Sequence, residues 1–309
     1  MQHIYDLTQA RHEQPSLVTI GVFDGVHRGH QHLIEQLVKD AHSAGRQAVV
    51  LTFFPHPDVV LRGLHGRYYL TTPEQRADQL GRLGVDLVVT QRFDEDFRQI
   101  RAAEYINQLL QHLKMAVLCV GADFAMGYQR EGNVPFLQQQ AVEKGFTLHV
   151  IDLVARNGDE TISSTAIRNT LQAGDIEQAN EWLGRAYALS GEVVHGDHRG
   201  RTIGFPTANI RVWEEQVIPA NGVYACWAYV GAQRYMAVTN IGVRPTFAGE
   251  GVTVEAHLLD FDREIYGETL TITFEKRLRA EQRFNGIEAL VAQIKADAQA
   301  GRDYLAQQG

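Results

Sequence analysis

The chain has 309 residues, a hydrophobic fraction of 44% and a formal net charge of −8. Its length favours about two domains, and its hydrophobic fraction excludes a mostly disordered chain. The negative charge disfavours general nucleic-acid binding, although nucleotide binding needs only a local positive site.

Features that would place the chain outside the cytosol are not found in the sequence. The two cysteines, Cys119 and Cys226, fit a reducing compartment better than a disulfide scaffold. The first residues carry no basic and apolar leader, and no apolar run approaches the roughly 18 residues of a membrane span. We therefore expect a cytoplasmic protein with neither nucleic acid nor membrane as a partner, and its oligomeric state stays open.

The first predicted element is a buried strand, the apolar run at residues 17–20. Apolar residues at helical spacing follow from residue 33 to residue 41. The stretch between them, GVFDGVHRGH at residues 21–30, is therefore a strand-to-helix turn. A helix N-terminus suits phosphate, and His27 and His30 would add donors for charge that develops on a phosphorus atom.

Other interpretations of this turn remain open from the residues alone. The stretch contains neither GxxxxGK[ST], GxGxxG nor HExxH, so it is not a P-loop, a Rossmann fingerprint or a zinc protease motif. A glycine turn with two surface histidines is the plain alternative. A metal pair of His27 and His30 is another, but it lacks an obvious third ligand.

Strands and helices alternate along the first half of the chain. Further strands are expected at residues 47–53, 86–90, 116–120 and 147–151, and helices at residues 73–83, 102–113 and 134–144. The two prolines of FPHP predict an extended loop at residues 54–57. This alternation predicts an α/β doubly wound parallel sheet, in which ligands bind beyond the carboxyl ends of the strands. The HxGH turn, FPHP and GADF should therefore converge on one crevice.

The stretch TISSTAIR at residues 161–168 stands before a helical pattern. Its hydroxyl side chains are natural N-caps, and that role alone would account for Ser163. A helix at residues 175–183 then runs almost directly into Gly184 and Arg185, where the pattern changes. We therefore expect one domain at residues 1–184 and a second at residues 185–309.

Short alternating runs and turn signals fill residues 184–285, with little helix. Strands are expected at residues 189–195, 223–229, 253–259 and 270–274. Several short strands in about a hundred residues predict a small antiparallel β-barrel. A final amphipathic helix should pack on it through a stripe of Ile287, Leu290, Val291 and Ile294.

A glycine-rich stretch opens the barrel, with Gly191, Gly196, Gly200 and Gly204 before PTAN at residues 206–209. Such glycines would let backbone N–H groups close on a phosphate chain. The alternative is a glycine-rich barrel corner. Glu255, in a later strand, could equally be an outward-facing strand residue.

Taken together, these motifs resemble those of one family. The HxGH turn and TISSTAIR are similar to the two ATP motifs of the HxGH nucleotidyltransferases, in particular the bacterial FAD synthetases. GFPTAN at residues 204–209 and NIGVRPTF at residues 240–247 are similar to the riboflavin kinase signature. With FPHP and GADF, six ordered motifs cover nearly the whole chain. The resemblance is to the bifunctional bacterial riboflavin kinases/FMN adenylyltransferases.

This resemblance implies two reactions with ATP, each served by Mg²⁺. Riboflavin and ATP would give FMN and ADP on the barrel, and FMN and ATP would give FAD and pyrophosphate on the α/β domain. His27 and His30 would contact the ATP phosphates, Glu255 would be the kinase base, and Thr207 and Asn209 would hold Mg²⁺ and phosphate.

The resemblance also implies further contacts. In the adenylyltransferase, ATP contacts would come from Gly21, Phe23, Asp24, Gly29, Ser163, Ser164, Thr165 and Arg168. Its flavin contacts would come from Phe53, Pro55, His56, Asp123 and Phe124. In the kinase, ATP contacts would come from Gly191, Gly196, Gly200, Gly204, Pro206, Thr207 and Asn209. Its flavin contacts would come from Asn240, Arg244, Arg279 and Phe284.

The chain departs from the family pattern at a few positions. Ala125 and Met126 stand where an Arg-Phe pair is frequent, which removes a cation that could hold the FMN phosphate. Asn133 replaces an acidic residue and Val243 a threonine.

Two rival functions follow from these departures and from the motifs. One is a kinase with an inactive adenylyl half, and the other is a flavin-binding regulator without turnover. Retention of His27, His30 and Glu255 argues against the regulator, because a pure binder needs none of them.

Overall fold

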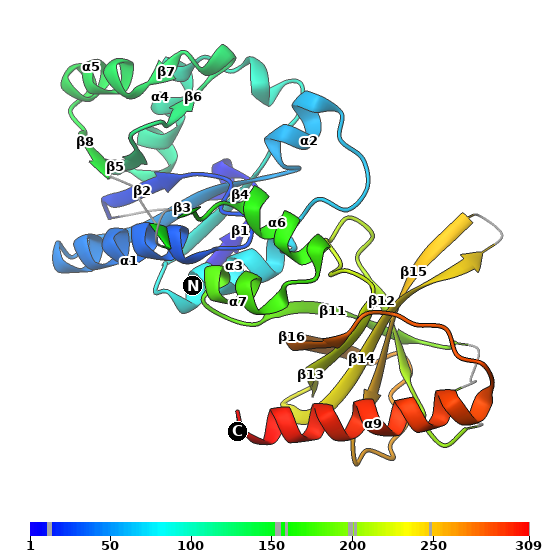
Figure 1. Cartoon of the computed structure of the whole chain (residues 1–309). Helices are drawn as coiled ribbons and strands as arrows, with labels where there is room; N and C mark the ends of the chain where they lie inside the picture. The colour runs from blue at the N-terminus through cyan, green and yellow to red at the C-terminus, as the bar shows by residue number, and fades with distance from the viewer. Residues whose placement is uncertain are drawn as a thin grey trace. The chain divides into compact units, whose positions relative to one another are not determined.

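The structure, a computed structural model, describes residues 1–10, 14–151, 156–157, 160–196, 200, 203–246 and 249–308. Within that set, only the backbone is described for residues 156–161 and 244–250. The chain forms two compact units, Met1–Ser164 and Thr165–Gly309. Figure 1 labels their helices and strands.

The first unit is built on a six-stranded parallel sheet in the order β1-β4-β3-β2-β5-β8 (Figure 1). Its strands are β1 (Gln2–Ile4), β2 (Ser16–Ile20), β3 (Gln47–Phe54), β4 (Leu87–Arg92), β5 (Met115–Gly121) and β8 (Thr147–Ile151). The predicted doubly wound α/β fold is confirmed. The sequence analysis missed β1, because three residues are too few to show a period.

Helices and short elements connect these strands. The helices are α1 (Arg28–Ser43), α2 (Pro57–Arg62), α3 (Pro73–Arg82), α4 (Ala102–Leu113) and α5 (Val134–Lys144), with 3₁₀ turns η1 (Leu7–Gln9), η2 (Phe97–Gln99) and η3 (Tyr128–Arg130). Two small ribbons are β6 (Ala125–Met126) with β7 (Gly132–Asn133), and β9 (Arg156–Asn157) with β10 (Glu160–Thr161). Helix α2 was not predicted, although Pro57 at its first position and the His56 cap explain why it starts there.

Both faces of the sheet are covered by helices. Ile20, Leu51 and Leu118 belong to a core that includes residues of α4 and α5. Val50 and Cys119 belong to a second core with residues of α1 and α3. Since strands buried on both faces read as continuous apolar runs, this arrangement explains why those runs showed no alternation. Cys119 is a free, buried cysteine within this second core.

The second unit contains a closed antiparallel barrel in the order β11-β12-β15-β14-β13-β16 (Figure 1). Its strands are β11 (Tyr187–Val194), β12 (Ala208–Val212), β13 (Gly222–Val230), β14 (Gln233–Thr246), β15 (Gly249–Leu258) and β16 (Thr269–Arg279). The barrel is confirmed. Residues 240–246, for which no strand was expected, belong to strand β14, whose pairing with β15 overrides the poor strand propensity of Asn240, Gly242 and Pro245.

Helices α6 (Ser164–Ala173) and α7 (Ile176–Leu183) precede the barrel. The Asn180 side-chain amide donates to the Phe274 carbonyl oxygen at 2.7 Å, and its oxygen accepts from the Tyr187 N–H at 2.7 Å. Helix α7 is thus fastened to the barrel. The domain boundary at residues 184/185 stays a prediction, since the compact units divide twenty residues earlier.

The C-terminal helix α9 (Ile287–Ala306) packs on the barrel, as expected. Its buried contacts differ from the predicted stripe, because Ile287 is 62% exposed while Leu305 is buried with Trp227. A Cβ built on Gly301 would lie 2.6 Å from a Val238 methyl, so the helix approaches the barrel closely at this glycine. None of the helices in the described ranges is long and apolar enough to cross a membrane.

Candidate active sites

The first candidate site lies where β2 ends and α1 begins. His27 is the N-cap residue of α1, and His30 lies in its first turn. Their rings are stacked, with centroids 3.6 Å apart and planes at 21°. Phe23 reaches the His30 ring edge-on at 5.2 Å from a left-handed backbone (φ 50°). The turn therefore holds two imidazoles together at the positive end of a helix.

The protonation of His30 follows from its surroundings. Burial, with smaller effects of His27 and the Arg76 guanidinium, lowers the pKa of His30 well below 6.5. The ring is therefore neutral at pH 7 and keeps one N–H donor. Its Nδ1 has no hydrogen-bond partner among the described residues. In the described part of the chain, no group of three His, Cys, Asp or Glu residues that could hold a metal ion is found.

Asp24 plays a structural part in this turn. Its buried carboxylate accepts from the backbone N–H groups of Leu70 and Thr71 at 3.1–3.2 Å. It also lies 3.8 Å from the guanidinium of Arg76, and both side chains are fully buried. The prediction that Asp24 contacts ATP is therefore corrected for its side chain, which has no exposed surface to offer a ligand.

Arg76 was not predicted to belong to the site, yet its side chain forms hydrogen bonds that connect two segments of it. Its guanidinium donates to the Val22 carbonyl at 2.9 Å, the Thr52 hydroxyl at 2.9 Å and the Phe53 carbonyl at 3.1 Å. These groups belong to the HxGH turn and to the end of β3. From the sequence, Arg76 reads as one more charge on helix 73–83, and no local signal marks it as buried.

A cavity of about 720 Å³ opens beside the turn. Among the predicted residues, its lining includes Gly21, Phe23, His30, Phe53, His56, Asp123 and Phe124. Pro55 does not line it, and Gly29 is buried inside the first turn of α1. The HxGH, FPHP and GADF loops thus meet at one crevice, as expected.

Aromatic rings make up one wall of the cavity. Phe97 stands 5.7 Å from Phe53, 5.6 Å from Phe93 and 5.2 Å from Tyr105, measured between ring centroids. All four residues line the cavity. Tyr105 is buried, and its hydroxyl has no partner among the described residues. Such a wall suits a planar aromatic ligand with polar edges. Tyr105 was missed because in sequence it is simply one of the buried positions of helix 102–113.

His56 has a defined orientation in this cavity. Its Nδ1 accepts from the Asp58 N–H at 3.0 Å, and its own backbone N–H donates to the Tyr69 hydroxyl at 2.9 Å. These two hydrogen bonds fix the position of the His56 ring and backbone at the edge of the cavity.

In the second ATP motif, TISSTAIR, one hydrogen bond connects the motif to the HxGH turn. The Ser164 hydroxyl donates to the Asp24 carbonyl oxygen at 2.9 Å, which joins this motif to the HxGH turn. Ser163 lies just before α6, whereas Thr165 and Arg168 lie on α6 in the second unit. The ATP contacts of Ser163, Thr165 and Arg168 stay predictions.

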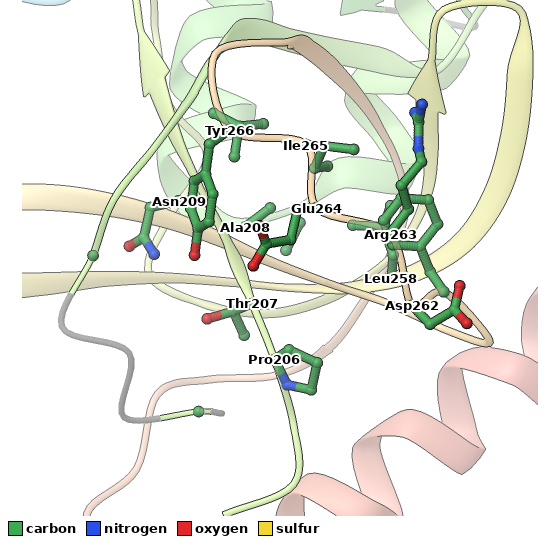
Figure 2. Close-up of a pocket in the computed structure, with 15 residues that line it drawn as sticks. Pro206, Thr207, Ala208, Asn209, Leu258, Asp262, Arg263, Glu264, Ile265 and Tyr266 are labelled. Atoms are coloured by element: carbon green, nitrogen blue, oxygen red, sulfur yellow. The ribbon is translucent and has the colours of Figure 1, made fainter. Parts of the chain in front are cut away.

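The second candidate site is a pocket of about 200 Å³ on the barrel. Figure 2 shows residues 206–209 along the chain that leads into β12, and residues 262–266 on the opposing loop. Gly196, Gly200, Pro206, Thr207 and Asn209 line this pocket, and their contacts with ATP stay predictions. The loop at residues 261–266 was missed, because its acidic residues resemble ordinary turn residues.

The glycines of this stretch have different reasons to be glycine. A Cβ on Gly196 would lie 2.3 Å from the Asn209 amide nitrogen, and one on Gly200 2.3 Å from the Phe205 carbonyl oxygen. In contrast, Gly191 is pressed against the Arg211 carbonyl in the ladder, and Gly204 is an exposed turn residue with φ 86°. Gly191 and Gly204 do not line the pocket, so barrel closure and turn geometry account for them.

Three polar residues form a row across neighbouring strands. In the ladder, Glu255 on β15 is directly opposite both Asn209 on β12 and Asn240 on β14. Directly opposite residues project from the same face of a sheet. Val254 and Ala256 are buried, so Glu255 projects from the outer face of the barrel. Glu255 thus stands between the predicted metal residue and a predicted flavin residue.

The other predicted flavin residues of the kinase lie outside the Asn209–Glu255–Asn240 row. The Arg279 guanidinium forms three hydrogen bonds of 2.7–3.1 Å with the Asp297 carboxylate of α9 and lies 5.8 Å from the ring of Phe284. The Arg279 side chain thus holds α9 through Asp297, and its predicted contact with flavin stays a prediction. The side chain of Arg244 and all of Phe247 fall outside the described residues.

Comparisons with known proteins match both parts of the chain to protein families. The riboflavin kinase family model matches residues 183–305, and the FAD synthetase family model matches residues 9–166. Proteins of Listeria monocytogenes and Escherichia coli, both named bifunctional riboflavin kinase/FMN adenylyltransferase, are 40% and 39% identical to the chain. These matches cover 94% and 98% of this chain and 92% and 96% of theirs.

One solved structure extends the comparison to three dimensions. It is described as a macrolide-efflux protein from Streptococcus pneumoniae and shares 29% identity with this chain, with a TM-score of 0.87. The superposition covers 97% of this chain and 98% of that one. The likeness supports the two-unit architecture.

Proposed function

The chain belongs to the bifunctional riboflavin kinase/FMN adenylyltransferase family, and we propose that each of its two sites carries out one reaction of that pair. The barrel site transfers the γ-phosphoryl group of ATP to a riboflavin hydroxyl, giving FMN and ADP. The HxGH site then joins FMN to the adenylyl group of ATP, giving FAD and pyrophosphate. Its substrates are small molecules.

In the kinase reaction, the row of Asn209, Glu255 and Asn240 orders the two substrates. ATP lies in the pocket on the Thr207 and Asn209 side, and riboflavin lies on the Asn240 side. Glu255 stands between them and accepts the proton of the attacking hydroxyl, the role that phosphoryl transfer to an alcohol requires.

Magnesium fits the residues of the kinase pocket. The Thr207 hydroxyl and the Asn209 amide offer neutral oxygens, and the backbone at Gly196 and Gly200 approaches so closely that a Cβ would fill the space. Mg²⁺ commonly keeps several waters and binds few protein groups together with substrate phosphates. When bound, it neutralises charge on the ATP phosphates.

In the adenylyl reaction, the FMN phosphate is already an ionised nucleophile, so no strong base is needed. Its oxygen forms a bond to the α-phosphorus of ATP, and the bond from that phosphorus to pyrophosphate breaks. Neutral His30 donates a hydrogen bond to oxygen as charge shifts, and His27 stacks against it. The aromatic wall of the cavity receives the isoalloxazine ring.

The observation that carries this proposal is the occurrence of two groups of residues in one chain: the stacked pair of His27 and His30, of which His30 lines the cavity, and the Asn209–Glu255–Asn240 row. The test is to incubate the purified chain with riboflavin, ATP and Mg²⁺ and to resolve the flavins by chromatography. FAD supports both activities. FMN alone supports the rival in which only the kinase works, and unchanged riboflavin supports a flavin-binding regulator.

A further inference from the structure

Binding of the FMN phosphate in the cavity of the HxGH site needs a cation, and residue 125 does not supply one in this chain. FMN brings a phosphate with about two negative charges, which must be held in line with the ATP phosphorus. Residue 125, where an Arg is frequent in the family pattern that the chain resembles, is Ala in this chain. His30 is neutral, so it cannot replace that charge. Among the described lining residues, the cationic side chains are Arg98 and Arg130.

These two arginines differ in their partners. The Arg98 guanidinium forms an ion pair with Glu95 at 3.0 Å, which compensates its charge. Among the described residues, Arg130 forms no ion pair with a carboxylate. Its one hydrogen bond runs from the guanidinium to the backbone carbonyl of Asp123 at 3.2 Å, which leaves other N–H groups available. Arg130 therefore brings an uncompensated positive charge to the cavity.

The segment that carries Arg130 is held firmly in place. A Cβ on Gly127 would lie 2.6 Å from the Ala102 nitrogen, and one on Gly132 2.7 Å from the Ala102 Cβ. Between these contacts, the Glu131 carboxylate accepts from Arg101 at 2.6–2.9 Å and from the Ala102 N–H at 2.8 Å. The start of α4 thus fixes the turn on both sides of Arg130.

The backbone of Arg130 itself is in a conformation that directs the turn. Its φ of 61°, like the 52° of Gln129, lies in the left-handed region that non-glycine residues seldom adopt. Such a conformation persists where surrounding contacts determine it. The neighbouring acid, Asp123, also lines the cavity. A carboxylate repels phosphate but accepts from hydroxyl and N–H groups, so Asp123 suits the ribityl or ring part of a flavin.

We propose that Arg130 binds the phosphate of FMN in the adenylyl site and thereby distinguishes FMN from flavins that lack a phosphate. This inference rests on the proposed function. The planar guanidinium fork can give two parallel hydrogen bonds to phosphate oxygens while its third arm keeps the Asp123 carbonyl. Arg130 compensates on η3 for the arginine absent from β6.

The test is steady-state FAD formation by the full chain from FMN, ATP and Mg²⁺. A hydrogen bond to a charged group of this kind corresponds to about 10- to 100-fold in affinity. Arg130→Ala should therefore raise the KM for FMN by roughly that factor, with the KM for ATP unchanged. Arg130→Lys keeps the charge without the fork and should recover part of the loss. Arg92→Ala removes an exposed arginine that pairs with Asp94 and does not line the cavity, and it should leave the KM for FMN unaltered.

Lumiflavin, an isoalloxazine without a ribityl phosphate, separates phosphate binding from general damage. Its inhibition constant against FMN should be the same in Arg130→Ala and in the unaltered chain. An unchanged KM for FMN in Arg130→Ala would overturn the inference, and so would an equal rise in the KM for FMN and the inhibition constant of lumiflavin. If the unaltered chain forms no FAD, the adenylyl half of the proposed function fails. If the unaltered chain does form FAD, the results with these variants test only the role of Arg130 in binding the FMN phosphate.

Discussion

His30→Ala is the sharpest test of the stacked histidines. The substitution removes one neutral donor that lies against His27 and Phe23 and borders the cavity. A preorganised donor to developing negative charge contributes about 10²–10³ in rate. Because burial disfavours a positive charge on the His30 ring, the ring acts as a neutral donor, and we expect the lower end, a loss of about 10²-fold in FMN adenylylation. ATP binding should weaken far less, because the donor acts mainly in the transition state.

The assay follows both half-reactions on one purified protein. Riboflavin phosphorylation should be unaffected, since its residues lie on the barrel. His32→Ala, an exposed histidine on the same helix, is the matched control and should retain both activities. The lost ring contacts amount to about 0.5–1.5 kcal/mol each, so unfolding must be followed as well. Near-normal FAD formation by folded His30→Ala would refute the reasoning and leave the two histidines as ordinary residues of a glycine turn.

The same histidine sets an expectation for pH. Its pKa is lowered in the folded chain, so below pH 6.5 the unfolded state binds more protons than the folded state. The stabilising contribution is present above pH 6.5 and is lost as the pH falls from there toward the folded pKa. Thermal unfolding of the first unit should therefore shift to lower temperature below pH 6.5. If His30→Ala shows the same pH dependence as the unaltered chain, another group is responsible.

Three further outcomes are expected. Glu255→Gln should lower FMN formation strongly and spare FAD formation from supplied FMN. The control Glu192→Gln, at an exposed position of β11, should change neither activity. Equal loss of both activities in Glu255→Gln would show that Glu255 supports the fold. Gly196→Ala should raise the kinase KM for ATP, because the new Cβ would lie 2.3 Å from the Asn209 amide nitrogen. An unchanged KM would show that the loop can shift to accommodate the Cβ. Asp297→Ala should lower the melting temperature of the barrel unit by several degrees, since it leaves a part-buried arginine without its partner; calorimetry gives the answer.

The architecture was largely accessible from sequence, because each unit follows one repeating pattern. Apolar runs alternating with helical stripes specify a parallel sheet, and period-two runs specify a barrel. Strand β14 was missed for a physical reason: Asn240 and Gly242 have low strand propensity, and only pairing across the barrel explains their conformation. On α9, burial of Asp297 depends on Arg279 of β16, a partner that no local pattern reveals.

The candidate sites divide in a similar way. Motif residues such as His30 and Asn209 carry their chemistry in the sequence, and the structure brings them to cavities. Asp24 lies within a motif yet faces the interior, where its carboxylate is shared by Leu70, Thr71 and Arg76. The sequence shows an acid at this position whether it supports the fold or contacts a ligand. Only the folded structure distinguishes the two roles.

The ladder position of Glu255 limits how the length of this hairpin can vary among relatives. Inserting one residue within β15 between Gly251 and Glu255, unless absorbed as a bulge, would present a neighbouring apolar side chain to the substrates and turn the carboxylate into the barrel. Inserting two residues would restore the face but displace the carboxylate by about 7 Å. Insertions and deletions that preserve the kinase should therefore gather at the hairpin end beyond the Arg244–Gly251 pair.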